Sequence, residues 1–235
     1  MKLLAIDTAT EALSAALWLD GEIIERYSVV IREHAAKLPL LVPALLADAG
    51  LLLQQLDGLV CGIGPGSFAG VRIGVSYVKG LALGLDLPVV GVSSLAMLAQ
   101  AVLTEHPDAT ALAAIDARMD EVYFGAYRRV DGVAMAVQDD AVGPAAAITV
   151  PPNGPFVATG SGWDVHRGAL LVAVPVAPES ISADRFPHAG AALQIAAGRF
   201  ATGQVTDAAL LVPAYLRNRV ALTRLEQQAL RDSRR

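Results

Sequence analysis

The chain has 235 residues, of which 54% are hydrophobic and 17% charged, with a mean hydropathy of +0.48 and a formal net charge of -5. This length suffices for one large domain or for two of about 100 residues each. No apolar run reaches about 18 residues without proline or charge, which predicts no membrane-spanning segment. The start MKLLAIDTAT meets Asp7 too early for a signal peptide, and the single cysteine, Cys61, is typical of a cytoplasmic protein.

The predicted elements of the first hundred residues begin with strands and continue by alternating strand and helix. Strands are expected at 2–8, 14–20, 22–31, 56–63 and 87–93, and helices at 35–49, 70–85 and 94–104. Asp20-Gly21 indicates a hairpin turn between the second and third strands. The pattern favours an α/β fold.

The second half of the chain repeats the start of the first. LLAIDTATEALSAALWLDG, from residue 3, resembles LAAIDARMDEVYFGAYRRVDG, from residue 112. Each segment has an apolar strand ending in Ile-Asp, a polar turn, an alternating strand and a closing Asp-Gly. We therefore predict two related halves, at 1–105 and 110–216, followed by an arginine-rich tail at 217–235.

The rest of the second half has weaker patterns. The stretch 142–155 is rich in proline, glycine and alanine and is predicted to form connecting turns. A strand is expected at 156–160 and a helix at about 188–202. Asp139-Asp140 reads as a solvated turn, and Asp120-Glu121 is either acid/base machinery or, more simply, a charged hairpin tip.

Two related halves that each open with a strand, an aspartate and a hairpin suggest the duplicated actin, Hsp70 and sugar-kinase (ASKHA) fold. In that fold the two hairpins clamp the phosphates of ATP, and close approach of a phosphate requires small residues. The first hairpin here reads DTAT and the second DARM, without glycine. The fold is thus expected to be retained and the clamp degraded, with Asp7, Thr8, Thr10 and Asp116 as its remnants.

The segment GIGPGSFAGVRIG, residues 62–74, lies between a predicted strand and a predicted helix, which is the setting of an anion site. It lacks the lysine of a Walker loop, the spacing of a dinucleotide fingerprint and the glycines of a nucleophile elbow. Gly64, Gly66 and Ser67 form either a closely packed turn with positive φ, the interpretation we favour, or an anion contact. The four histidines are far apart, so no metal site is predicted.

The helices expected at 35–49 and 70–85 are apolar around most of their circumference, so they are either wholly buried or part of a protein interface. Gly70, Gly74, Gly80 and Gly84 form two pairs at four-residue spacing, which permits close helix approach. The candidate interface residues are His34, Leu38, Leu41, Val42, Leu45, Leu46, Arg72, Ile73, Tyr77 and Leu81.

Several segments together resemble the TsaB (YeaZ) family: LLAIDTAT, GPGSFAGVRIG, KGLALGLDLPVVGVSSLAMLA, AAIDARMDEVYFGAY and PAYLRNRVA. The resemblance implies the ASKHA fold and a subunit without catalytic residues, metal or cofactor of its own. It implies pairing with TsaD, which the ATPase TsaE joins, and ATP and metal are expected on those partners. Such complexes transfer a threonylcarbamoyl group to adenosine 37 of tRNAs that read codons beginning with A, so tRNA is expected to be reached through the complex.

In this family the helices matching 35–49 and 70–85 contact TsaD, and the same surface can form a homodimer. The chain departs from the family at Ala69, where threonine is usual, and at Pro39 and Pro43. Pro43 would remove a helical hydrogen bond or delay the helix start. A further departure is Asp120, which stands where glycine is common.

Two alternative functions remain, an ATP-dependent kinase or ATPase of the same fold and a peptidase. The hairpins without glycine count against the first, and the missing nucleophile motif counts against the second. If the interface hypothesis holds, Leu45→Glu or Tyr77→Glu should break the complex with TsaD and leave the chain folded.

Overall fold

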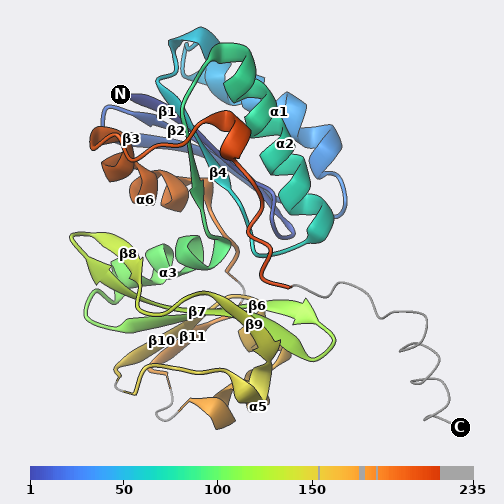
Figure 1. Cartoon of the computed structure of the whole chain (residues 1–235), viewed down its shortest axis with the longest axis vertical. Helices are drawn as coiled ribbons and strands as arrows, with labels where there is room; N and C mark the ends of the chain where they lie inside the picture. The colour runs from blue at the N-terminus through green and yellow to red at the C-terminus, as the bar shows by residue number, and fades with distance from the viewer. Residues whose placement is uncertain (153, 175–177, 184, 218–235) are drawn as a thin grey trace, which may run out of the picture.

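The computed structural model contains two mixed β-sheets (Figure 1). It describes residues 1–235 except 153, 175–177, 184 and 218–235. The first sheet contains β1 (Lys2–Asp7), β2 (Ala12–Leu19), β3 (Glu22–Val29), β4 (Gly58–Gly62) and β5 (Val89–Val92). The second contains β6 (Thr110–Arg118), β7 (Glu121–Val130), β8 (Val133–Ala136), β9 (Ala141–Pro144), β10 (Phe156–Thr159) and β11 (Ser180–Ser182).

The two sheets share one strand order, which confirms the predicted duplication. The first runs β3-β2-β1-β4-β5, and the second runs β8-β7-β6-β10-β11. In each, an antiparallel hairpin precedes two strands that pair in parallel. Asp20-Gly21 and Asp131-Gly132 turn the corresponding hairpins, all four residues having positive φ.

The helices separate the molecule into layers (Figure 1). They are α1 (His34–Asp48), α2 (Phe68–Leu85), α3 (Ser94–Glu105), α4 (Gly162–Val165), α5 (Arg167–Ala173) and α6 (Ala189–Ala201). Helices α1 and α2 cover the outer face of the first sheet, α3 and α6 lie between the sheets, and α4 packs on the second sheet and on α5. Helix α3 comes from the first half but packs on the second sheet, whereas α6 packs on the first, so each half covers the sheet of the other.

Three clusters of buried side chains correspond to the contacts between these layers. The largest joins the facing sides of both sheets through α3 and α6. The second lies between the first sheet and α1 and α2, and the third lies on the outer side of the second sheet. Because the central cluster contains residues of both halves, the two halves are held in one arrangement.

Several predictions need correction. Residues 141–144 form β9, which pairs with β7, although their composition indicates turns. Asp140 is not solvated: its carboxylate accepts hydrogen bonds from Ser93 Oγ at 2.6 Å and from the Tyr127 hydroxyl, so it joins the two halves. The start of α1 is not delayed by Pro43, which lies inside the helix with Pro39. Tail residues 218–235 lie outside the described residues.

Although the sequence predicts no membrane-spanning segment, helix α2 is long and apolar enough to cross a membrane by length and composition alone. One side of this helix packs on β1 and β4. Its buried residues, including Val71, Val75 and Val78, recur at helical spacing. The apolar character of α2 therefore has two parts, a buried stripe and an exposed face.

Candidate functional site

A cleft of about 910 Å³ lies between the two halves. The first half contributes the β1–β2 turn, the loop before α1 and the start of α2, while the second contributes the β6–β7 turn. Residues 213–217, which we call the C-terminal segment, line another side. Of the residues predicted for a phosphate site, the lining contains Thr10, Gly66, Ser67 and Asp116.

The glycine-rich loop packs against the β1–β2 turn. Gly64 has a φ of +89°. A Cβ on Gly66 would lie 2.1 Å from the Ala9 carbonyl oxygen, and one on Gly70 would lie 2.2 Å from the Thr8 carbonyl oxygen. The Ser67 N–H donates to the Ala9 oxygen at 2.7 Å, and its side-chain oxygen accepts from the Gly70 N–H and caps α2. Close packing and helix capping therefore explain these residues.

Substitution by alanine is expected to have opposite effects on stability at a closely packed glycine, Gly66, and at a glycine with open surroundings, Gly80. Gly66→Ala places a Cβ against a backbone atom that cannot move freely, and we expect a loss of about 1–3 kcal/mol. Gly80→Ala is the matched control, because a Cβ there meets nothing within 4 Å. In a helix interior this change should stabilise the chain by up to about 1 kcal/mol. Urea denaturation of both variants tests the difference, and equal midpoints would contradict it.

Asp7 is fully buried at the end of β1. One carboxylate oxygen accepts from the Ala9 N–H at 3.2 Å, and the other has no hydrogen-bond partner among the described residues. Burial raises the pKa of Asp7 to about 7, although the Ala9 hydrogen bond and nearby His188 act in the opposite direction. Gly62 makes this burial possible, because a Cβ there would lie 1.8 Å from Asp7 Oδ1.

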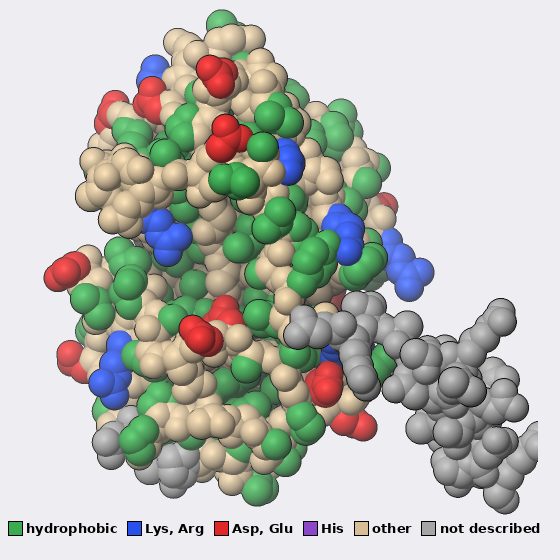
Figure 2. All heavy atoms as spheres, viewed as in Figure 1, with side chains coloured by type: hydrophobic (Ala, Val, Ile, Leu, Met, Phe, Trp, Pro, Cys, Tyr) green, Lys and Arg blue, Asp and Glu red, His purple; other side chains and the backbone are tan. Residues whose placement is uncertain are grey.

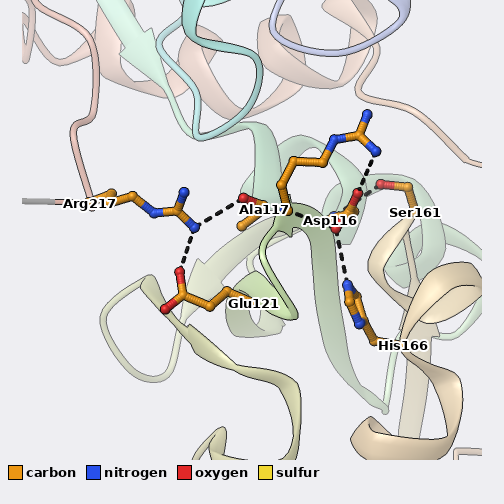
Figure 3. Close-up of polar contacts among 7 residues, drawn as sticks. Asp116, Ala117, Glu121, Ser161, His166 and Arg217 are labelled. Atoms are coloured by element: carbon orange, nitrogen blue, oxygen red, sulfur yellow. Dashed lines mark hydrogen bonds and ion pairs between the residues drawn. The ribbon is translucent and has the colours of Figure 1, made fainter. Parts of the chain in front are cut away.

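Asp116, at the matching position of the second half, has different surroundings (Figure 3). Its carboxylate contacts His166 Nε2 at 3.0 Å and the Arg118 guanidinium at 3.2 Å, and the Arg118 N–H donates to it at 3.0 Å. Burial raises the pKa of Asp116, but the His166 and Arg118 contacts outweigh it, so the pKa is lowered overall. The carboxyl at the same repeat position therefore has a raised pKa in one half and a lowered pKa in the other.

The β6–β7 turn has an unusual backbone. Arg118, Met119 and Asp120 have φ values of 64°, 58° and 59°, a left-handed run without glycine. Residues other than glycine adopt this left-handed backbone conformation at an energetic cost. Asp120 is part of this strained turn.

Arg217, the first residue of the predicted arginine-rich tail, lines the cleft and makes a contact within the chain that the sequence did not predict. Its guanidinium donates to the Ala117 carbonyl oxygen at 3.0 Å and pairs with the Glu121 carboxylate (Figure 3). Farther back, the Ala214 N–H donates to the Ile63 oxygen at 2.8 Å. The C-terminal segment therefore ties the first half to the β6–β7 turn. No local pattern reveals this contact, because about a hundred residues separate the partners.

The ASKHA fold implies a nucleotide between the two turns, but the residues present do not fit its phosphates. In the first turn the Thr8 hydroxyl donates to the Gly70 oxygen at 2.7 Å, and Thr10 Oγ1 accepts from the Ala12 N–H at 3.3 Å. The Ala9 N–H is bonded to Asp7. In the second turn, Met119 stands where a small residue is needed.

The predicted interface residues fall into two groups. His34, Leu38, Val42, Leu45 and Leu46 are buried inside this chain, and His34 Nε2 contacts the Ala12 oxygen at 3.2 Å. Leu41, Arg72, Ile73, Tyr77 and Leu81 are half-buried. The expectation that Leu45→Glu leaves the chain folded is therefore wrong.

The most exposed leucines of α1 and α2 are not among the predicted interface residues. Leu40 is 72% exposed and Leu83 is 61% exposed. Gly80 and Gly84 are exposed as well, and an added Cβ at either would meet nothing within 4 Å. We call these four residues, with the half-buried Leu41, Ile73, Tyr77 and Leu81, the outer face of α1 and α2. Hydrophobic side chains reach the surface over both halves of the molecule in Figure 2.

The doubled sheet order and the paired turns define a protein of the ASKHA class. A protein-family model described as "TsaD: tRNA N6-adenosine threonylcarbamoyltransferase" matches residues 25–183. The chain is 37% identical to the tRNA threonylcarbamoyladenosine biosynthesis protein TsaB of Escherichia coli, over 96% of this chain and 98% of the relative. It is 34% identical to TsaB of Haemophilus influenzae, over 96% and 97%.

The structural comparison agrees. A solved structure described as YeaZ from Pseudomonas aeruginosa matches with a TM-score of 0.85 and 40% identity, covering 92% of this chain and 99% of that one. The chain belongs to the TsaB (YeaZ) family, within the broader family that the TsaD model describes.

Proposed function

We propose that this chain is a supporting subunit in the biosynthesis of threonylcarbamoyladenosine in tRNA, and that it acts by binding TsaD through the outer face of α1 and α2. TsaE joins this pair, and ATP and metal reside on the partners. Adenosine 37 of tRNAs that read codons beginning with A is the acceptor, and the reaction takes place in the cytoplasm. In the absence of TsaD, the same face pairs two copies of the chain.

The observation that carries the proposal is the pair of solvent-facing glycines in α2. Gly70 and Gly74 are explained by this chain, since a Cβ on Gly74 would lie 2.5 Å from Thr8 Oγ1. Gly80 and Gly84 have open space around them, and each destabilises the helix by about 1 kcal/mol relative to alanine. A partner element that packs closely on this part of α2 explains why these positions lack side chains.

The exposed leucines support the same interface. Leu40 and Leu83 expose large apolar side chains, and a binding partner would remove them from water. The cleft gives less support to a catalytic role, because the polar groups of the first turn are hydrogen-bonded within the chain. These features favour a binding subunit over a kinase, an ATPase or a peptidase.

Two variants test the interface without disturbing the core. Gly80→Leu blocks close approach by its size, and Leu83→Glu places a charge in the contact, so each should weaken binding to TsaD at least tenfold. Gly198→Leu is the control, because Gly198 is an exposed helical glycine of α6 with equally open surroundings. Gel filtration with TsaD and thermal unfolding of each variant are the measurements. Co-elution of both interface variants at wild-type affinity would overturn the proposed interface.

The role itself is tested by reconstitution. TsaD, TsaE, ATP, a threonylcarbamoyl-adenylate source and unmodified tRNA are incubated with and without this chain, and the modified nucleoside is measured by mass spectrometry. We expect product only when the chain is present, and a loss of product with Gly80→Leu. Equal product in its absence would refute the supporting role.

A further inference from the structure

Basic side chains gather around the cleft although the chain is acidic overall. The cleft is lined by Arg32, Arg72, Arg118 and Arg217, but by only two acidic residues, Glu11 and Asp116. The arginines come from the loop before α1, the first turns of α2, the β6–β7 turn and the C-terminal segment. With a formal net charge of -5 for the whole chain, the gathering of four arginines from separate segments marks the cleft as a local exception.

Not all four arginines are equally available to a ligand. Arg217 is paired with Glu121, and Asp116 lies beside Arg118, whose side chain is nevertheless 79% exposed. Arg32 and Arg72 have no carboxylate within ion-pair distance among the residues that the structure describes. Three guanidinium groups, those of Arg32, Arg72 and Arg118, can therefore contact an anion at the mouth of the cleft.

Aromatic rings stand beside these charges. The Arg72 guanidinium lies 3.2 Å from the centroid of the Phe68 ring and 5.0 Å from that of Tyr215. Both rings are largely exposed, Phe68 by 60% and Tyr215 by 56%. Exposed aromatic rings and guanidinium planes are the surfaces on which unpaired bases stack, and arginines beside them bind phosphates.

Two of the available arginines also occupy costly backbone conformations. Arg32 has a φ of 59° and Arg118 a φ of 64°, in the region where glycine is the least strained residue. Strain of this kind is often found where a side chain has a function that the backbone does not require. Here the side chains at both strained positions face the same cleft.

We propose that this mouth, formed by Arg32, Phe68, Arg72, Arg118 and Tyr215, binds an unpaired stretch of RNA. The arginines contact its phosphates, and a base stacks on the exposed ring of Tyr215 or Phe68. The inference rests on the proposed function, under which the RNA is a loop of the substrate tRNA. Arg72 lies in α2, whose outer face is the proposed TsaD contact, so RNA and partner meet on neighbouring parts of one helix.

The test is fluorescence anisotropy with a labelled anticodon stem–loop, measured over a range of salt concentrations with the full chain, alone and mixed with TsaD. The variant Arg32→Gly/Arg118→Gly should weaken the binding at least tenfold. It should also reduce the slope of log K against log salt by about 1.4, since each lost phosphate contact in a single strand contributes about 0.7. Tyr215→Leu should weaken binding several-fold and leave that slope unchanged.

The glycine substitutions separate binding from folding. Because glycine relieves the left-handed backbone at both positions, the melting temperature of the double variant should not fall. The control is Arg129→Ala/Arg199→Ala, which removes the same charge from exposed positions outside the cleft lining. Its RNA binding should match that of the wild type.

Three results would overturn the inference. The first is an equal loss of RNA binding in the mouth variant and the control variant. The second is the absence of any arginine-dependent RNA binding, with or without TsaD. The third is saturable binding of free ATP that displaces the RNA and is lost in the mouth variant. The last result would assign the mouth to a nucleotide. Gel filtration with TsaD distinguishes this inference from the proposed function. If the mouth variant co-elutes with TsaD but has lost RNA binding, the result supports the RNA site and the proposed function. If the wild-type chain binds RNA but forms no complex with TsaD, the result refutes only the proposed function.

Discussion

Replacing Leu45 by glutamate is expected to unfold the chain rather than to disturb an interface selectively. Leu45 is fully buried between α1 and the first sheet, inside a cluster of apolar side chains. The lost apolar contacts cost about 2–5 kcal/mol, and the unpaired buried charge adds a penalty of several kcal/mol. Together these costs approach or exceed the roughly 5–15 kcal/mol that stabilise a typical domain.

The measurement is circular dichroism during thermal and urea denaturation of the purified variant. Leu45→Ala, which creates a cavity without a charge, should still unfold cooperatively with a loss of about 2–5 kcal/mol. Leu40→Glu is the matched control, because Leu40 lies on the same helix and is 72% exposed. Its free energy of unfolding should change by less than about 0.5 kcal/mol. A cooperative, native-like transition for Leu45→Glu would contradict the observed packing.

Asp7 is expected to make the stability of the chain fall as the pH rises from about 4 to about 7. Burial raises the pKa of this carboxyl from 3.8 to about 7 in the folded state. The folded state therefore binds more protons than the unfolded state in this range. The stabilising contribution of the proton is complete below pH 3.8 and is lost as the pH rises through about 7. The difference between the two limits is roughly 4 kcal/mol.

Asp7→Asn removes this dependence because the amide does not titrate. The difference in unfolding free energy between Asp7→Asn and the wild type should move in favour of the variant between pH 4 and pH 8, and then remain constant. Glu11→Gln, at an exposed position of the neighbouring turn, should retain the wild-type pH profile. Urea titrations at a series of pH values provide the comparison, and parallel profiles for Asp7→Asn and the wild type would contradict the raised pKa of Asp7.

The residues of α1 show what periodicity could and could not predict. The buried positions 34, 38, 42 and 45 follow helical spacing, so the stripe that faces the sheet is present in the sequence. Exposed Leu40 and two prolines lie on the opposite side of the helix, so the sequence alone predicts a helix that is apolar all round. Packing against β2 and β3 decides which leucines are core and which are surface.

The glycine-rich loop gives a similar result. Spacing alone left both a packed turn and an anion contact open, because both require small residues next to a backbone. The position of the β1–β2 turn decides between them, since the carbonyl oxygens of Thr8 and Ala9 occupy the space that side chains at Gly70 and Gly66 would need.

The two halves, their hairpins and most helices and strands are predictable from the amino-acid sequence, because these depend on local features. Asp-Gly pairs favour the positive φ of hairpin turns, and apolar and polar residues alternate along the strands. The order of strand, turn and strand is repeated in the two similar segments. Tertiary packing alone fixes the exchange of α3 and α6 between the sheets, the hydrogen bonds that half-buried Asp140 accepts from Ser93 and Tyr127, and the contact of Arg217 with the β6–β7 turn. Each of these joins residues far apart in the chain, and the free energy that fixes them comes from packing and desolvation that no short segment contains.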